Sequence, residues 1–324
     1  MALLITGAMG RIGYEAARRA AADGTNVVAQ YRSTFLAAEA AAAGPSVTWV
    51  SCDLTDRAAV ERMLTTHSID ACIHLAVIPN DVMARPDPLR TFDINVGVVA
   101  ALLDAARRQQ WRRFVFVSSG AVIQATPDCN TPLTEDAPVS PLTIYGTTKY
   151  CAELLTRMYR TQYDVSAASV RISRVYGPSI ADDELPLRGP IPTFLKKAVA
   201  GIPIREKSGA DYVASFTYMD DVVDGLLVLV RAPTLKHDVY HLEAGVNYSV
   251  AQVAAAIRAS VPGATVEIGP GSEPWSAGSK LRPPLNGDRL FRETGFKVST
   301  NLEMGIQKYA DWLRARARTA GKSA

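Results

Sequence analysis

Short apolar runs alternate with alanine-rich segments through the first half of the sequence, and this alternation restricts the fold more than any other feature. The runs are almost continuously apolar, as strands buried on both faces are. We expect strands at 3–6, 26–31, 47–53, 71–76, 113–119 and 166–172, and helices at 14–24, 56–67, 93–110 and 148–163. Strand–helix–strand repetition predicts an α/β fold with a doubly wound parallel sheet covered on both faces.

The pattern changes after residue 172. Proline and glycine become frequent between 177 and 209, and the periodicity becomes irregular. Apolar strand and helix patterns return in "SFTYMDDVVDGLLVLV" (215–230). A chain of 324 residues has room for two lobes. We therefore predict a first domain over 1–172, to which 214–236 returns, and a smaller C-terminal lobe within 173–316.

Charge and composition exclude several classes of protein. The net charge is +3, and no basic cluster is interleaved with aromatic residues, so no nucleic-acid partner is expected. No run approaches the ~20 apolar residues of a membrane span, and the N-terminus lacks a signal-peptide pattern. The four cysteines show no CxxC or Cys/His spacing, so no metal is expected. These features predict a cytoplasmic protein with no membrane partner.

Three glycines stand where the first predicted strand meets the first predicted helix. They are Gly7, Gly10 and Gly13 in "LLITGAMGRIGYEAARRA". Residues without a Cβ allow the backbone to approach a pyrophosphate, and a helix N-terminus supplies N–H groups for the anion. A glycine-rich tight turn is the alternative. The strand–turn–helix context favours a dinucleotide site, although the spacing G-x-x-G-x-x-G, with Met9 inside it, differs from G-x-G-x-x-G.

A tyrosine and a lysine are four positions apart in "TIYGTTKY" (143–150). On a helix, Tyr145 and Lys149 would lie on one face. A free tyrosine has a pKa near ~10, and a fixed positive charge close by lowers it. The pair is therefore a candidate general acid/base. The alternative is a partly exposed tyrosine and lysine on an amphipathic helix.

TGxxGxxG at the first turn followed by YxxxK resembles the extended short-chain dehydrogenase/reductase family, which contains NAD(P)-dependent sugar epimerases and dehydratases. Six further segments resemble the family in its own order: "CDLTD", "IHLA", "DINVGVVAALLDAA", "FVFVSSGAV", "RISRVYGP" and "FTYMDDVVDG". The resemblance covers nearly the whole chain. It implies a Rossmann-type doubly wound parallel sheet with a smaller C-terminal substrate-binding lobe.

The resemblance also implies which residues bind the cofactor. They are Gly7, Met9, Gly10, Arg11, Ile12 and Gly13 in the glycine loop, then Tyr31, Arg32, Ser33, Asp53, Leu54, Leu75, Ala76 and Asn95, together with Tyr145 and Lys149. Asp53 would contact the adenine, and Asn95 would support the active site.

The end of the second predicted strand bears on the choice of cofactor. NAD-specific relatives generally have an acidic residue there, for the ribose hydroxyls. Here Tyr31, Arg32 and Ser33 follow instead, and an arginine with a hydroxyl suits a 2′-phosphate. Arg11 could assist. We expect NAD(P), with a preference for NADP; the alternative is that Arg32 is a solvated loop residue.

For catalysis, the resemblance implies that Tyr145 gives or takes the hydroxyl proton. Lys149 would lower the pKa of this tyrosine and hold the nicotinamide ribose, and Ser119 would orient the substrate oxygen. Ser118 is the competing candidate for that role. Dehydratases carry an Asp-Glu pair after the hydroxyl residue, whereas this chain has glycine and alanine at 120 and 121, so 4,6-dehydration is set aside. Epimerisation and simple oxidation or reduction stay open.

The substrate is expected to be a small carbohydrate, either a nucleotide sugar or a free sugar or sugar acid. Nucleotide-sugar relatives grip the diphosphate with an Asn and an Arg, at positions where this chain has Arg174 and Ala214. Arg174 or Arg282 could supply the missing phosphate contact from another position and are candidate substrate-binding residues, and Arg282 in "SKLRPPL" resembles a second phosphate-contacting arginine of the family. The alternative function is a non-catalytic NAD(P)-binding regulatory protein. Relatives commonly form homodimers through two helices, which correspond here to 93–110 and 148–163.

Overall fold

The computed structural model describes residues 1–124, 129–180, 189–275 and 281–320, with side chains as far as 318. A seven-stranded parallel sheet forms the larger part, in the order β11-β6-β5-β4-β1-β2-β3. Its strands are β1 (Ala2–Thr6), β2 (Val27–Tyr31), β3 (Val47–Ser51), β4 (Ile69–His74), β5 (Arg113–Ser119), β6 (Ala167–Ile172) and β11 (Val239–Leu242). The order reverses between β1 and β4, and in such sheets ligands bind beyond the carboxyl ends of the strands at this point. The predicted Rossmann-type fold is confirmed.

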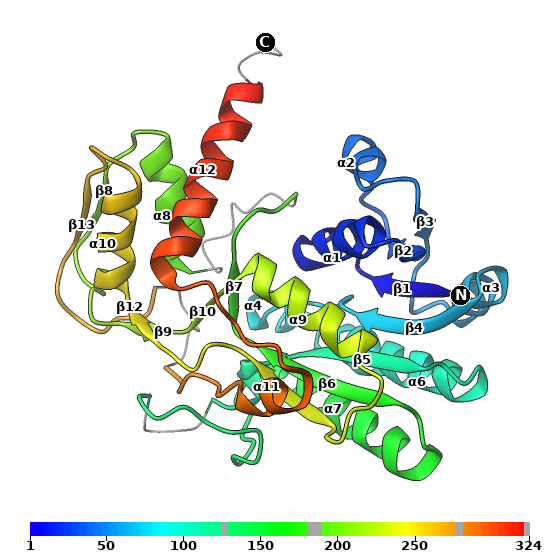
Figure 1. Cartoon of the computed structure of the whole chain (residues 1–324). Helices are drawn as coiled ribbons and strands as arrows, with labels where there is room; N and C mark the ends of the chain where they lie inside the picture. Colours follow the sequence, from blue (N-terminus) through cyan, green and yellow to red (C-terminus); the bar gives the residue numbers. More distant parts are fainter. Residues whose placement is uncertain (125–128, 181–188, 276–280, 321–324) are drawn as a thin grey trace.

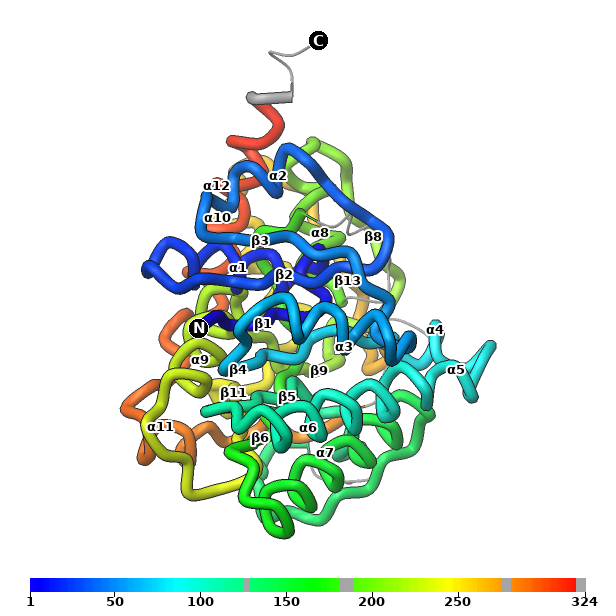
Figure 2. Tube along the Cα trace, turned by 90° about the vertical axis from the view of Figure 1, so that its right-hand side faces the viewer, coloured from blue at the N-terminus to red at the C-terminus, as the bar shows by residue number. Residues whose placement is uncertain are grey.

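Helices cover both faces of the sheet (Figure 1). On one face are α1 (Arg11–Ala22) and α9 (Met219–Arg231), and on the other are α3 (Arg57–Thr66), α6 (Val98–Arg108) and α7 (Ile144–Tyr163). Successive strand residues serve opposite faces, so Leu3 and Ile5 pack toward α1 and α9, while Leu4 packs toward α6. Figure 2 shows α6 and α7 side by side on the second face.

The element boundaries follow the sequence prediction closely. The six predicted strands begin and end within two residues of the observed ones. The helix predicted at 148–163 begins earlier, at Ile144, because Thr143 caps it by accepting the Gly146 N–H at 3.1 Å. The helix predicted at 93–110 begins instead as a π-helical turn, η1 (Asp93–Gly97), that continues into α6.

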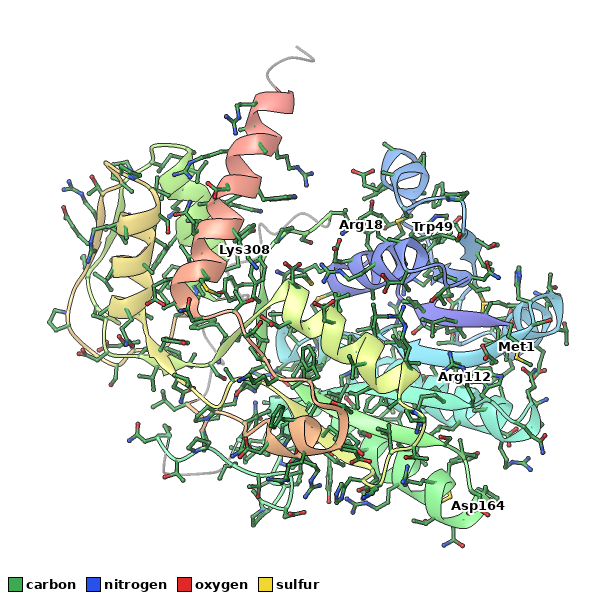
Figure 3. The ribbon with its side chains drawn as sticks, in the orientation of Figure 1. Met1, Arg18, Trp49, Arg112, Asp164 and Lys308 are labelled. Carbon is green, nitrogen blue, oxygen red and sulfur yellow. The ribbon has the colours of Figure 1, made fainter. Side chains whose placement is uncertain are left out.

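A second, smaller domain has its own apolar core (Figure 1). Its helices are α8 (Pro190–Val199), α10 (Val250–Ser260) and α12 (Leu302–Ala320). It also contains two short two-stranded sheets. In one, β8 (Ile204–Glu206) pairs with β13 (Val266–Ile268), and in the other, β9 (Val213–Ala214) pairs with β12 (Tyr248–Ser249). The parallel pair β7 (Arg174–Tyr176) and β10 (Phe216–Tyr218) links it to the sheet. Lys308 on α12, labelled in Figure 3, lies 5.4 Å from the ring centroid of Tyr218, just before α9.

One assignment from the sequence is wrong. The sequence pattern places the segment 237–316 wholly in the small lobe, but β11 pairs with β6 as an edge strand of the main sheet, and α11 (Asp288–Thr294) packs on β11. An apolar run of four residues without a following crossover helix is too short to be recognised as a sheet strand. The position of the domain boundary near residue 172 stays a prediction, and 181–188, within the Pro- and Gly-rich stretch, lie outside the described residues.

The described residues contain neither a membrane-spanning helix nor a clustered metal-ligand set. No helix there is long and apolar enough to cross a bilayer. No group of three or more His, Cys, Asp or Glu side chains in that part of the chain is arranged to hold a metal ion.

Candidate active site

The glycine loop joins β1 to α1 at the carboxyl edge of the sheet. Gly7 has φ +64°, a conformation that L side chains rarely adopt, and a Cβ there would lie 3.0 Å from the Cα of Ala76. A Cβ on Gly13 would lie 2.3 Å from the Gly7 carbonyl oxygen. The loop therefore requires glycine both for its turn and for its close packing against α1. Its backbone and the N-terminus of α1 form a cradle suited to a pyrophosphate.

Two buried polar side chains that the sequence analysis missed hold this loop in place. Gln30 of β2 accepts the Gly7 N–H at 2.9 Å and donates its Nε2 to the Cys52 carbonyl at 2.6 Å. Thr6 accepts through Oγ1 from the N–H groups of Leu75 and Ala76, at 3.0 and 3.1 Å. In the sequence, the only indication of these two residues is that each is polar in an otherwise apolar strand. These bonds connect the glycine loop to the ends of β3 and β4.

The predicted adenosine-side residues follow β2 and β3. Arg32 and Ser33 are exposed, and Tyr31 stacks on Phe35 with ring centroids 4.9 Å apart. Asp53 is exposed and accepts from the N–H and hydroxyl of Thr55; these hydrogen bonds lower its pKa below the usual range.

The other predicted cofactor residues of this region are less exposed. Met9 and Leu54 are buried, and Ile12 is half-buried. Arg11, expected to assist with a 2′-phosphate, instead donates to the Val175 carbonyl at 3.3 Å, which directs it toward β7.

The structure separates the two serine candidates at the end of β5. Ser118 is buried and donates to Glu153 Oε1 at 2.5 Å. Ser119 accepts the Ala121 N–H at 3.1 Å, and its hydroxyl acts on the Tyr145 side chain, whose pKa it lowers. Consecutive strand residues face opposite ways, so Ser119 is the one directed to Tyr145.

Tyr145 lies in the first turn of α7. Burial raises its pKa, because the phenolate is poorly solvated there, while the Ser119 hydrogen bond and the charge of Arg282 lower it. Lys149, the residue expected to lower it, donates to the Val117 carbonyl at 2.7 Å, and its Nζ lies 5.9 Å from the Tyr145 ring centroid. Burial also lowers the pKa of Lys149 to about 7. The influences that lower the pKa of Tyr145 in this structure are thus the Ser119 hydroxyl and, after it, the charge of Arg282, while the ammonium of Lys149 is bonded to the backbone of β5.

Asn95, predicted to support the site, lies in the π-helical turn, a feature frequent at functional sites. Its Nδ2 donates to Thr148 Oγ1 at 3.1 Å, and its Oδ1 accepts the Ile78 N–H at 2.9 Å. Asn95 therefore ties the segment after β4 to α7, one residue before Lys149.

The structure brings the two predicted substrate arginines to one region. Arg282 donates to Ser173 Oγ at 3.0 Å, and its Nη1 lies 3.2 Å from where a Gly120 Cβ would be. Burial and the neighbouring charge of Arg174 lower the pKa of Arg282 to about 10. Arg174 itself donates to the Tyr212 hydroxyl at 3.2 Å. Arg282 therefore lies over the residue that follows Ser119.

A glycine turn suited to a pyrophosphate at the switch point of a doubly wound sheet, with Ser119 at the carboxyl end of β5 and Tyr145 at the start of α7, is typical of dinucleotide-binding oxidoreductases. The sequence model of the "NAD dependent epimerase/dehydratase family" matches residues 3–245, and the chain belongs to this family, whose members are enzymes of the extended short-chain dehydrogenase/reductase type.

Known relatives resemble the chain along its whole length. It is 29% identical to a UDP-glucose 4-epimerase of Mycolicibacterium smegmatis, over 98% of this chain and 100% of the relative. In structure it resembles the UDP-glucose 4-epimerase of Thermotoga maritima solved with UDP-glucose, at 20% identity and TM-score 0.84, over 98% of this chain and 100% of that one. It also resembles the UDP-glucose 4-epimerase of Thermus thermophilus solved in complex with NAD, at 23% identity and TM-score 0.83, over 97% of this chain and 99% of that one.

Proposed function

We propose that this protein is an NAD(P)-dependent oxidoreductase or epimerase acting on a secondary alcohol or ketone of a carbohydrate. The observation that carries the proposal is the placement of Ser119, the last residue of β5 at the carboxyl edge of the sheet, where its hydroxyl lowers the pKa of Tyr145 in the first turn of α7. The UDP-glucose 4-epimerase from Mycolicibacterium smegmatis, similar over its full length, supports the reaction class.

The cradle at Gly7 and Gly13 fits a dinucleotide, because a Cβ at either position would collide with backbone. When bound, the nicotinamide would accept or return a hydride at the substrate carbon. Oxidation of the alcohol also releases the hydroxyl proton, which Tyr145 takes and, in the reverse direction, gives back. Ser119 bonds the same substrate oxygen and stabilises its developing charge. By the family resemblance, Lys149 would hold the nicotinamide ribose of the bound cofactor, whereas here its ammonium donates to the Val117 carbonyl.

Epimerisation or redox chemistry is favoured over 4,6-dehydration. Elimination of water needs an additional acid and base beside the hydroxyl residue, and Gly120 and Ala121 supply neither. The guanidinium of Arg282 occupies the space beside Gly120.

For the cofactor, we propose a preference for NADP. Arg32 and Ser33 are exposed beyond β2, where no acidic residue follows, and a guanidinium binds a phosphate in a charge-assisted fork. The NAD bound to the Thermus relative supports a nicotinamide dinucleotide in general. In a calorimetric titration we expect tighter binding of NADP than of NAD. Arg32→Ala should weaken NADP about tenfold and leave NAD unchanged. Equal affinity of the parent for both would contradict the preference.

For the substrate, a nucleotide sugar and a free sugar or sugar acid remain the two candidates. Similarity to UDP-glucose 4-epimerases supports the first, whereas Arg174 and Ala214 depart from the diphosphate-gripping pattern. A thermal-shift screen of both classes with cofactor present identifies ligands, because a true ligand stabilises the fold by mass action. Turnover of a ligand from this screen is the expected result. Cofactor binding without turnover of any carbohydrate would favour the regulatory alternative instead.

A further inference from the structure

Glu243 is a buried carboxylate that the proposed proton transfer does not use. It follows β11 directly and is 3% exposed. Its Oε1 accepts the Ser215 hydroxyl at 2.9 Å, and its Oε2 accepts the Leu285 N–H at 2.5 Å. A buried charge is costly unless it is paired and hydrogen-bonded, so these contacts call for a function beyond packing.

A series of hydrogen bonds leads from this carboxylate to Arg282. The hydroxyls of Ser215 and Ser173 are 3.0 Å apart, and Arg282 Nη2 is 3.0 Å from Ser173 Oγ. Each hydroxyl has a single proton to donate, and an ionised Glu243 can only accept. Ser215 therefore donates to Glu243, and Ser173 donates onward to Ser215 or to Glu243 itself. The lone pairs of Ser173 are then left for the guanidinium, which can only donate.

The far end of this series is Arg282. Its backbone carbonyl accepts from Asn247 Nδ2 at 3.1 Å. Within the described part of the chain, its Nε is enclosed without a hydrogen-bond partner, and Ser173 accepts from its Nη2. Its Nη1 reaches over Gly120, and its charge acts on Tyr145.

We propose that Glu243 is a positioning residue that, through Ser215 and Ser173, holds the Arg282 guanidinium beside Tyr145. The inference rests on the proposed function for its catalytic meaning, since Tyr145 is the proposed proton-transfer group. Among the described residues, the charged and titratable groups around Tyr145 are Lys149 on α7, Asp81 at the start of the short helix α4 (Asp81–Ala84) and Arg282. The Asp81 carboxylate accepts the Ile144 N–H, and Arg174, Tyr212 and Glu243 lie behind Arg282.

The two ways in which Glu243 could influence Tyr145 have opposite signs. If Glu243 holds Arg282 in place, its neutralisation releases the guanidinium, and the pKa of Tyr145 rises. If Glu243 acted directly as a negative charge, its neutralisation would lower that pKa. Glu243→Gln keeps the shape of the side chain. Its amide oxygen would serve the Leu285 N–H, so its amide nitrogen would donate to Ser215 and reverse the direction of the series.

The test measures the phenol without needing a substrate. We would incorporate 3,5-difluorotyrosine, a more acidic phenol, at position 145 and follow its titration by ¹⁹F NMR in the full-length protein. In Glu243→Gln and in Arg282→Ala, the midpoint should move up by about 1 pH unit, as expected for losing a nearby opposite charge. Ser173→Ala, a small change that keeps both charged groups, should move it in the same direction. If Glu243→Gln does not fold, the titration midpoint in Ser173→Ala still tests whether the hydrogen-bond series acts on Tyr145.

Glu135→Gln is the matched control. Glu135 is also buried, accepts the His241 N–H at 2.9 Å and faces Arg289, so its neutralisation should leave the midpoint unchanged. The inference is overturned by an unmoved midpoint in Glu243→Gln and Ser173→Ala, by a downward movement, or by an equal rise in Glu135→Gln. Failure to find a carbohydrate substrate would contradict the proposed function and leave this titration unaffected.

Discussion

Glu153 of α7 and Arg171 of β6 form a buried ion pair, with Arg171 Nη2 2.8 Å from Glu153 Oε2. The two side chains are 3% and 2% exposed. Glu153 also accepts the Ser118 hydroxyl, and Arg171 Nη1 lies 3.3 Å from His241 Nε2 in β11. The pair and its two further contacts therefore connect the helix that carries Tyr145 to three strands of the sheet, β5, β6 and β11.

Glu153→Ala should destabilise the fold by about 3–5 kcal/mol, because it leaves the Arg171 charge buried without its partner. Equilibrium unfolding in urea measures the change. Asp104→Ala breaks the exposed contact with Arg107 and should cost no more than about 1 kcal/mol. Equal losses of unfolding free energy in the two variants would show that the buried ion pair contributes no more to stability than the exposed one.

Tyr145→Phe should fold and bind cofactor normally but lose at least ~10²-fold in turnover, the usual range for removing a general acid/base. Steady-state kinetics with an identified substrate, together with a cofactor titration, measure both properties. Tyr163→Phe is the control, since Tyr163 is 52% exposed at the far end of the same helix. Near-normal turnover in Tyr145→Phe would remove this tyrosine from the mechanism.

Lys149 should make stability depend on pH. Its folded pKa of about 7 is below the ordinary 10.5, so between these values the unfolded chain binds more protons, and stability rises with pH. The destabilising contribution is fully present below pH 7 and is relieved as the pH rises toward 10.5. The unfolding free energy of the cofactor-free parent, relative to Lys149→Met, should rise by at most about 1.4 kcal/mol per pH unit across this window. A pH-independent difference between the two would contradict the lowered pKa.

The sequence predicted those parts of the molecule that depend on local patterns. Continuous apolar runs located six strands, and the glycine spacing located the turn that needs Gly7 and Gly13. Contacts between distant segments were not predictable in this way. Gln30 interrupts an apolar strand, but the sequence does not indicate its partners, which lie 22 or more positions away; Glu243 has equally distant partners, and no local pattern distinguishes it from an exposed residue.

The pKa of Tyr145 was not predictable from the sequence for the same reason, because it depends on contacts between distant segments. Spacing on one helix correctly placed Lys149 near Tyr145, but it carried no information on the direction of the ammonium group. The Val117 carbonyl that accepts from Lys149 belongs to β5, and the Arg282 charge comes from a segment more than 100 residues further along. The pKa of a buried group depends on such neighbours, so it required the structure.

Gly13→Ala should abolish cofactor binding and destabilise the fold by about 1–3 kcal/mol, because the new methyl group would lie 2.3 Å from the Gly7 carbonyl oxygen. Gly97→Ala is the matched control: its nearest neighbour would be 4.0 Å away, and alanine is the better helix former. Thermal unfolding and a cofactor titration measure both variants. Normal cofactor binding by Gly13→Ala would exclude the loop as the pyrophosphate cradle.

Dimerisation through α6 and α7 is the last expectation. On α7, Leu154 is 43% exposed, and Tyr150 and Cys151 beside it are half-buried, which leaves an apolar face available to a second copy of the helix pair. The 34.8 kDa chain should therefore show twice this mass by light scattering at micromolar concentration. Leu154→Glu should give the monomer mass, because dimerisation would bury two unpaired carboxylates. Ile202→Glu alters an apolar residue of the small domain that is more exposed, at 53%, and should leave the dimer intact. A monomeric parent, or a dimer unaffected by Leu154→Glu, would rule out this interface.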